Sequence, residues 1–139
     1  MPFELSIVSP DGEWYRGPVD SVVLPGSEGE FAVLPNHERF LAPLSVGELE
    51  IRTPTDQLFA AIATGFAAVT GEEVAVMVES CEFAHTIDVA RAELARGRAE
   101  QGLAELGDPD EQRFGQYQAA LERAQNRIAV SRRASGSGS

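Results

Sequence analysis

Up to about residue 80, apolar and polar positions alternate with a period of two, the pattern of strands that bury one face. Glycine, proline and acidic residues interrupt the alternation every few residues. Such short runs, separated by turn residues, predict an antiparallel sandwich or barrel. The predicted strands are 3–8, 13–16, 19–24, 31–34, 40–45, 48–52, 57–63, 66–69 and 74–79.

From Thr86 the apolar spacing becomes helical. Thr86 is predicted to cap this helix, and Asp88 then lies in the first turn, where the helix dipole favours a carboxylate. The helix is expected to run to about Leu106, before a left-handed stop at Gly107. The sequence Asp108-Pro109-Asp110-Glu111 is typical of the start of a second helix. So short a connection predicts an antiparallel helical hairpin.

The second helix carries an apolar seam with three-then-four spacing. Its predicted members are Phe114, Tyr117, Leu121, Ala124 and Ile128. The first helix is rich in alanine, and its larger apolar residues are Ile87, Leu94, Leu103 and Leu106. Glycines at 97, 102 and 115 each cost about 1 kcal/mol relative to alanine. We therefore expect a marginally stable hairpin that docks on the sandwich or on another protein.

Charge divides the chain at the same place. The net charge is −11, and residues 1–85 contain 14 acidic and 3 basic side chains, whereas residues 86–139 contain 8 of each. The acidic balance argues against a nucleic acid partner. No apolar run approaches the roughly 20 residues of a membrane span, and we expect the chain to stay in the compartment where it is made. Cys81, the only cysteine, fits a reducing compartment and a structural thiol.

Every basic residue is arginine, whose planar fork suits carboxylate or phosphate. On a helical wheel Asp88, Arg91 and Arg98 share one side of the first helix, while Arg123 and Arg127 are one turn apart on the second. This arrangement could hold a polyanion such as a triphosphate. Arginines are also common on a solvated helix face, where an Asp–Arg pair contributes only about 0.2–0.5 kcal/mol. The chain lacks a Walker-type phosphate loop, so hydrolysis of a nucleotide is not expected.

Other candidate chemistry is sparse. His37, His85 and Cys81 lie far apart in the pattern, and no metal site is predicted. Acidic pairs such as Glu28 with Glu30 lie on turns and strand edges, where they keep the surface solvated. No nucleophile has a base near it, so no catalytic residue is predicted.

Residues 17–51, GPVDSVVLPGSEGEFAVLPNHERFLAPLSVGELEI, resemble the epsilon subunit of F-type ATP synthases. The resemblance continues over nearly the whole chain, and its shared elements are Pro25-Gly26, Gly29-Glu30, Leu34-Pro35-Asn36-His37, Gly47-Glu48-Leu49, Ala63-Thr64-Gly65-Phe66, Ile87-Asp88-Val89-Ala90-Arg91-Ala92 and Asn126-Arg127-Ile128. The combined pattern is specific, although each piece alone is weak. Asn36, Glu38 and Arg39 depart from the family pattern, which usually has glycine before the histidine and small or proline residues after it.

The resemblance implies a mainly β protein with an α appendage. An N-terminal antiparallel β-sandwich of about ten strands would cover residues 1–85, a C-terminal antiparallel two-helix hairpin residues 86–133, and a flexible tail residues 134–139. It further implies a non-catalytic subunit of the central rotor stalk, peripheral to the membrane on the bacterial cytoplasmic side. The expected partners are the gamma subunit, the c-ring and the alpha and beta catalytic subunits of a proton-translocating ATP synthase. The turn Pro35, Asn36, His37 and Glu38 would contact them.

In this family the hairpin can fold down or extend into the catalytic head, where it hinders ATP hydrolysis. The resemblance implies no required cofactor, but ATP as a possible regulatory ligand of the folded hairpin. The implied ATP-binding residues are Ile87, Asp88, Arg91, Ala92, Arg98, Arg123 and Arg127. The alternatives are a free-standing small-ligand-binding β-sandwich with a helical lid and, more distantly, a small acidic hydrolase.

Overall fold

The computed structural model describes residues 2–35, 38–106 and 111–136 and divides the chain into two compact units, Met1–Phe83 and Ala84–Ser139. The first unit contains β1 (Phe3–Ser9), β2 (Gly12–Val19), β3 (Ser21–Gly26), β4 (Gly29–Val33), β5 (Phe40–Leu44), β6 (Gly47–Arg52), β7 (Gln57–Ile62), β8 (Gly65–Val69), β9 (Glu73–Val78) and β10 (Cys81–Phe83). The second contains the 3₁₀ turn η1 (Ala84–Thr86) and the helices α1 (Val89–Glu105) and α2 (Glu111–Gly136). The predicted fold class, a β-sandwich followed by two helices, is confirmed.

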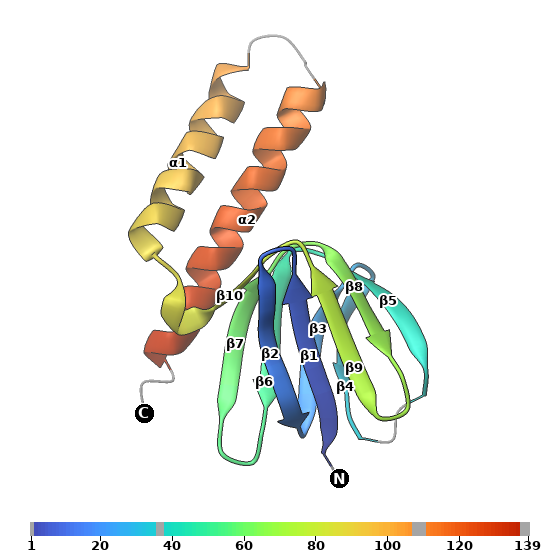
Figure 1. Ribbon diagram of the computed structural model, residues 1–139. Coiled ribbons are helices and arrows are strands. Elements are labelled where there is room, and N and C mark those ends of the chain that lie inside the picture. The colour runs from blue at the N-terminus through green and yellow to red at the C-terminus, as the bar shows by residue number, and fades with distance from the viewer. Residues whose placement is uncertain (1, 36–37, 107–110, 137–139) are drawn as a thin grey trace. The chain divides into compact units, whose positions relative to one another are not determined.

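The strands form one sheet that folds over into two layers, with the order β10-β7-β6-β3-β5-β8-β9-β1-β2 and β4 paired with β3 (Figure 1). The fold-over lies between β3 and β5, which pair only at Gly26 and Leu44. One layer is β5-β8-β9-β1-β2, and the other contains β10, β7, β6, β3 and β4. This arrangement leaves each layer with one inward and one outward face.

Alternate residues of both layers fill a continuous apolar core. Its largest fully buried side chains include Leu5, Ile7, Leu24, Leu49 and Ile51. Their strands show the alternating burial that the sequence predicts, as in β1, where Phe3, Leu5 and Ile7 are buried and the residues between them are partly exposed. At about 25 cal/mol per Å² of apolar surface, this core is the main stabilising term of the unit.

Two turns use glycine for a conformation that other residues rarely adopt. Gly12 has φ of 139° and Gly29 has φ of 137°, and each begins a strand directly after a tight turn. Glycine at these positions allows β1 to return as β2 and β3 to return as β4.

Three details of the sheet differ from the sequence prediction. One pairing is parallel, β1 with β9, because no tight turn connects these strands and fixes an antiparallel direction. Val19 belongs to β2 and not to β3, since the chain bends at Asp20, whose amide bonds to the carbonyl of Arg52. The three-residue strand β10, paired with β7, was not predicted because it is too short for a period to show.

In the second unit, α1 and α2 lie side by side and antiparallel, as predicted (Figure 1). The buried residues of the two helices are mostly small: Ala92 and Ala99 on α1, and Ala124, Ile128, Val130 and Ser131 on α2. Two members of the predicted apolar faces are instead exposed, Phe114 by 54% and Leu94 by 62%. The helices pack through alanines, so larger side chains off that line face solvent.

The helix boundaries also differ in part. The first helix begins at Val89, two residues later than a cap at Thr86 predicts, and ends at Glu105 with Leu106 as its C-cap. The predicted stop at Gly107 and the cap at Asp108 to Asp110 lie outside the described residues. The second helix runs to Gly136, so the residues assigned to the start of a flexible tail, 134–136, continue the helix.

Candidate functional site

The N-terminus of α1 contains the first group of predicted site residues. Asp88 is its N-cap, with an extended backbone (ψ of 99°), and its carboxylate oxygen accepts a hydrogen bond of 3.1 Å from the backbone amide of Arg91. Its carbonyl accepts the first helical bond, 3.0 Å from the amide of Ala92. Thr86, the predicted cap, lies in η1, two residues outside the position that the capping geometry requires.

The apolar members of the predicted site flank this cap. Ile87 is 8% exposed, and Ala92 is fully buried. These two residues therefore anchor the start of α1, while the side chains of Asp88 and Arg91 stay exposed to solvent.

The four predicted arginines share one position relative to the helix contact. Each directly precedes a buried residue: Arg91 precedes Ala92, Arg98 precedes Ala99, Arg123 precedes Ala124 and Arg127 precedes Ile128. Successive residues of an α-helix are about 100° apart, so each arginine lies at the same angle from its helix's inward line. Because the two helices are antiparallel, residues at this angle lie on the same side of the hairpin in both helices. We call this the arginine side of the hairpin.

The register between the helices sets how far apart these arginines lie along the hairpin. Gly102 faces the ring of Tyr117. Counting back along α1 from Gly102 and forward along α2 from Tyr117 places Arg98 level with Leu121, and Arg91 level with Ile128. The four arginines therefore fall within about two helical turns, or about 10 Å along the axis.

The four arginines differ in burial. Arg91, Arg98 and Arg123 are exposed, and no carboxylate in the described parts of the chain lies within ion-pair distance of them. Arg127 is half-buried, with its Nε shielded from solvent. Charge-assisted hydrogen bonds from such groups contribute about 1.5–3 kcal/mol each, so the arginine side can bind an anion with several oxygens.

The opposite side of the hairpin has a different character. Arg96 there bonds to Glu93, with its Nη2 2.6 Å from the carboxylate, and approaches Glu100 at 3.4 Å. A groove of about 330 Å³ lies beside this cluster, lined by Glu93, Arg96, Gln125, Ile128, Ala129 and Arg132. Because two carboxylates already neutralise Arg96, this groove is less suited to an anion than the arginine side.

The predicted subunit-contact turn of the first unit is described only at its ends. Pro35 is half-buried and Glu38 is exposed, whereas Asn36 and His37 lie outside the described residues. Its contact role stays a prediction.

A second surface of this unit was not predicted. A row of apolar side chains crosses the outward face of four adjacent strands: Val8 of β1 is opposite Met77 of β9, Met77 opposite Phe66 of β8, and Phe66 opposite Pro43 of β5. Phe66 is 51% exposed and Met77 44% exposed. We call this row the apolar face.

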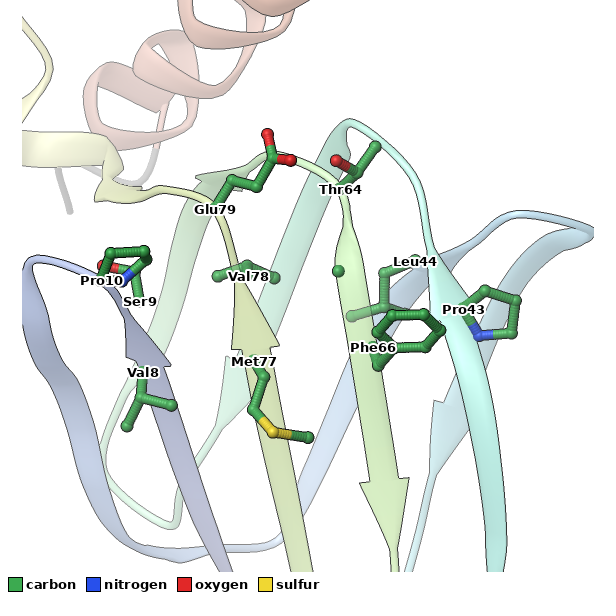
Figure 2. A pocket seen from close by; sticks show the side chains of 11 residues that line it. Val8, Ser9, Pro10, Pro43, Leu44, Thr64, Phe66, Met77, Val78 and Glu79 are labelled. Carbon is green, nitrogen blue, oxygen red and sulfur yellow. The ribbon is translucent and has the colours of Figure 1, made fainter.

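A shallow groove of about 590 Å³ runs along the upper end of the apolar face (Figure 2). Figure 2 shows Met77 and Phe66 projecting on the same side of the sheet, with Ser9, Pro10, Thr64 and Glu79 at the strand ends above them. Exposed apolar rows of this kind are typical of contacts with another protein. The sequence did contain a signal for this apolar face. Phe66 and Met77 alternate with the buried residues of their strands, at positions that a solvated face would fill with polar residues.

The thiol of Cys81 is not part of a reactive site. Burial, with a smaller contribution from the charge of Glu82, raises its pKa to about 12, so it stays protonated at neutral pH. Among the described residues, no three His, Cys, Asp or Glu side chains gather as metal ligands. None of the described helices has the length and hydropathy to cross a membrane.

Family models match both units. Residues 2–84 match the model for the β-sandwich domain of the ATP synthase delta/epsilon chain, and residues 85–132 match the model for its long α-helix domain. The chain belongs to this family of ATP synthase chains. The predicted resemblance to the epsilon subunit is thereby confirmed.

Two similar relatives within this family are both named as epsilon chains. The chain is 46% identical over 127 residues to an ATP synthase epsilon chain of Syntrophobacter fumaroxidans, covering 91% of this chain and 93% of the relative. It is 41% identical over 130 residues to ATP synthase epsilon chain 2 of Syntrophotalea carbinolica, covering 94% of each.

Two solved structures contain chains with the same fold. A chain in the OSCP/F1/c-ring structure of Euglena gracilis mitochondrial ATP synthase superposes with a TM-score of 0.79 at 25% identity, over 92% of this chain and 80% of that one. A chain in the central stalk and c-ring of the Tetrahymena thermophila enzyme has the same fold, with a TM-score of 0.62 at 14% identity over 94% of each chain.

Proposed function

We propose that this protein is a non-catalytic rotor subunit in the central stalk of a proton-translocating F-type ATP synthase. The β-sandwich couples the gamma subunit to the c-ring, and the hairpin hinders ATP hydrolysis when it extends toward the alpha and beta subunits. The complex holds the chain peripherally on the cytoplasmic side of the bacterial plasma membrane. The match of both units to the family models, and the epsilon chain that covers 91% of this chain, support this proposal and disfavour a free-standing binding sandwich.

The apolar face of the β-sandwich supports a contact with gamma. Its two central side chains, Phe66 and Met77, expose about half of their surface, and removing such surface from water contributes about 25 cal/mol per Å². A rigid sheet surface transmits torque better than a mobile loop, because a packed core deforms little.

The hairpin is proposed to bind ATP in its folded state. The observation that carries this part is the arginine side, where four arginines lie within about two turns of each other beside the Asp88 cap. The arginines would hold the phosphates, and Ile87 with Ala92, which are buried, would fix the start of α1 beside them. A tenfold preference of ATP for the folded state is about 1.4 kcal/mol, which biases a marginal hairpin without locking it.

Isothermal titration calorimetry of the purified full chain with ATP tests the sensing role. Saturable binding is expected, and Arg91→Ala weakens it by about tenfold, the loss of one charge-assisted bond. Arg132→Ala is the matched control, because this exposed arginine lines the opposite groove. Absence of heat at millimolar ATP, or equal losses in both variants, would refute nucleotide binding on the arginine side.

Reconstitution with the rest of the enzyme tests the rotor role. Phe66→Glu is expected to abolish co-purification with gamma, because it places a charge in the centre of the apolar face. Ala32→Glu, at an exposed position of β4 in the other layer, is expected to leave assembly unchanged. Deleting residues 86–139 should raise the ATP hydrolysis rate of the assembled enzyme. Unchanged hydrolysis would remove the inhibitory role while leaving the rotor assignment intact.

A further inference from the structure

The contact between α1 and α2 is unusually close at one glycine. A β-carbon placed on Gly102 would lie 2.6 Å from both Cδ1 and Cζ of Tyr117, and closer still to Cε1. Real β-carbons essentially never approach a non-bonded heavy atom within 3.0 Å. The Tyr117 ring therefore lies directly on the α1 backbone, in a notch that only glycine provides.

Two other helix glycines, Gly97 and Gly115, have no such neighbour. A β-carbon on Gly97 or on Gly115 would meet nothing within 4 Å. Gly102 instead continues the line of small residues through Ala92, Ala95 and Ala99 that faces α2. Packing thus requires glycine at position 102, whereas at 97 and 115 it does not.

We propose that Gly102 and Tyr117 are positioning residues for the anion site on the arginine side. The notch fixes the distance between the helices one turn beyond Arg98. This inference rests on the proposed binding of ATP by the hairpin, and it assigns the spacing of the arginines to a pair that touches no phosphate.

The physical reason is that both arginine pairs must reach the same anion. Arg91 and Arg98 move with α1, whereas Arg123 and Arg127 move with α2. If the helices separate at position 102, Arg98 moves away from Arg123, and a ligand can no longer bond to both helices without ordering them first. A preformed spacing removes that cost from binding.

Gly102→Ala and Gly97→Ala form a matched pair for the test. Both substitutions add one methyl group and the same gain in helix propensity to α1, but only the first meets the Tyr117 ring. Calorimetry of the full chain should show ATP affinity about tenfold weaker in Gly102→Ala and unchanged in Gly97→Ala. Thermal unfolding should show the hairpin less stable in the first variant and more stable in the second.

Substitutions at Tyr117 separate the notch from a general loss of stability. Tyr117→Phe keeps the ring and is expected to bind ATP as the unmodified chain does. Tyr117→Ala removes the ring, so adding Gly102→Ala to it should cause little further loss of affinity. If Gly102→Ala is too unstable to study alone, the comparison of Tyr117→Phe with Tyr117→Ala still tests the role of the ring.

Two results would overturn the inference. One is equal ATP affinity in Gly102→Ala and Gly97→Ala, and the other is the same loss from Gly102→Ala with and without the ring. Failure of the proposed ATP binding can be told apart from failure of this inference, because in the first case the unmodified chain binds no ATP at all. In that case the unfolding of Gly102→Ala, Tyr117→Ala and the double variant still shows whether Tyr117 and Gly102 are coupled in the hairpin.

Discussion

At the start of α1, one carboxylate determines where the helix begins. Asp88 lies within the family element that was predicted to bind ATP, yet in the structure it bonds to the backbone amide of Arg91. The sequence predicted Thr86 as the cap and placed Asp88 in the first turn, although both residue types are suited to capping. The 3₁₀ turn Ala84–Thr86, which brings the chain out of β10, decides between them.

Substitution of Asp88 tests this assignment. Asp88→Ala should lower the free energy of unfolding of the hairpin by about 1 kcal/mol, because the amide of Arg91 loses its acceptor. Asp88→Asn should retain most of that stability, since an asparagine oxygen also accepts. Helical circular dichroism during urea unfolding of the full chain provides the measurement. A loss as large for asparagine as for alanine would show that the charge matters and not the cap.

Cys81 gives the sandwich a pH dependence on the alkaline side. The unfolded thiol ionises near pH 9, whereas the native thiol stays protonated up to about pH 12 because it is buried. The raised native pKa means that this contribution is fully present below pH 9 and is lost as pH rises from 9 toward 12. The free energy of unfolding should fall by up to about 1.4 kcal/mol per pH unit there. Denaturant unfolding at pH 8, 9 and 10 should show this extra slope, and Cys81→Ala should lack it; identical slopes would contradict the assignment.

At the scale of elements, alternation alone located most of the strands. The exceptions have a shared cause, which is pairing with distant parts of the chain. Asp20 ends β2 because its amide bonds to Arg52, and β10 exists because Cys81–Phe83 meet the β7 residues Ala60–Ile62. Neither partner is near in sequence, so no local window contains the information.

The pairing of β8 with β9 depends on one glycine. A β-carbon on Gly65 would lie 2.7 Å from Cα of Val78 and nearer still to the carbonyl oxygen of Met77. Gly65→Ala should therefore destabilise the sandwich by about 1–3 kcal/mol, the usual cost of overpacking. Gly71→Ala is the control, since a β-carbon at that position in the β8–β9 connection meets nothing within 4 Å. Thermal unfolding should give a lower midpoint for Gly65→Ala than for Gly71→Ala. Equal midpoints would mean that β8 and β9 can shift apart to accommodate the added methyl group.

At the scale of the whole molecule, the chain consists of two units with different internal packing. Every residue of the main apolar core lies between Phe3 and Cys81. The second unit buries only three larger aliphatic side chains among the described residues, those of Ile87, Ile128 and Val130, and Leu94 and Phe114 remain exposed. The first unit can therefore be stable by itself, whereas the second depends more on its surroundings.

Separate expression of the two units tests this contrast. A fragment of residues 1–83 should unfold cooperatively in urea and retain a β-type circular dichroism spectrum. A fragment of residues 84–139 should be only partly helical in water, and Gly97→Ala with Gly115→Ala should raise its helicity, at about 1 kcal/mol per site. An unfolded first fragment would contradict the completeness of its core, and a fully helical second fragment would contradict its marginal stability.

The sequence by itself determined the division into a β unit and a helical unit, most strand positions, the antiparallel hairpin and the family. These depend on periodicity, turn residues and motifs, which are local properties of the chain. Only the tertiary structure decided that β1 lies parallel to β9, that Phe66 and Met77 form an apolar face with Val8 and Pro43, and that Gly102 receives Tyr117. Each of these joins residues distant along the chain, and their contacts exist only once the core and the helix register fix both partners in space.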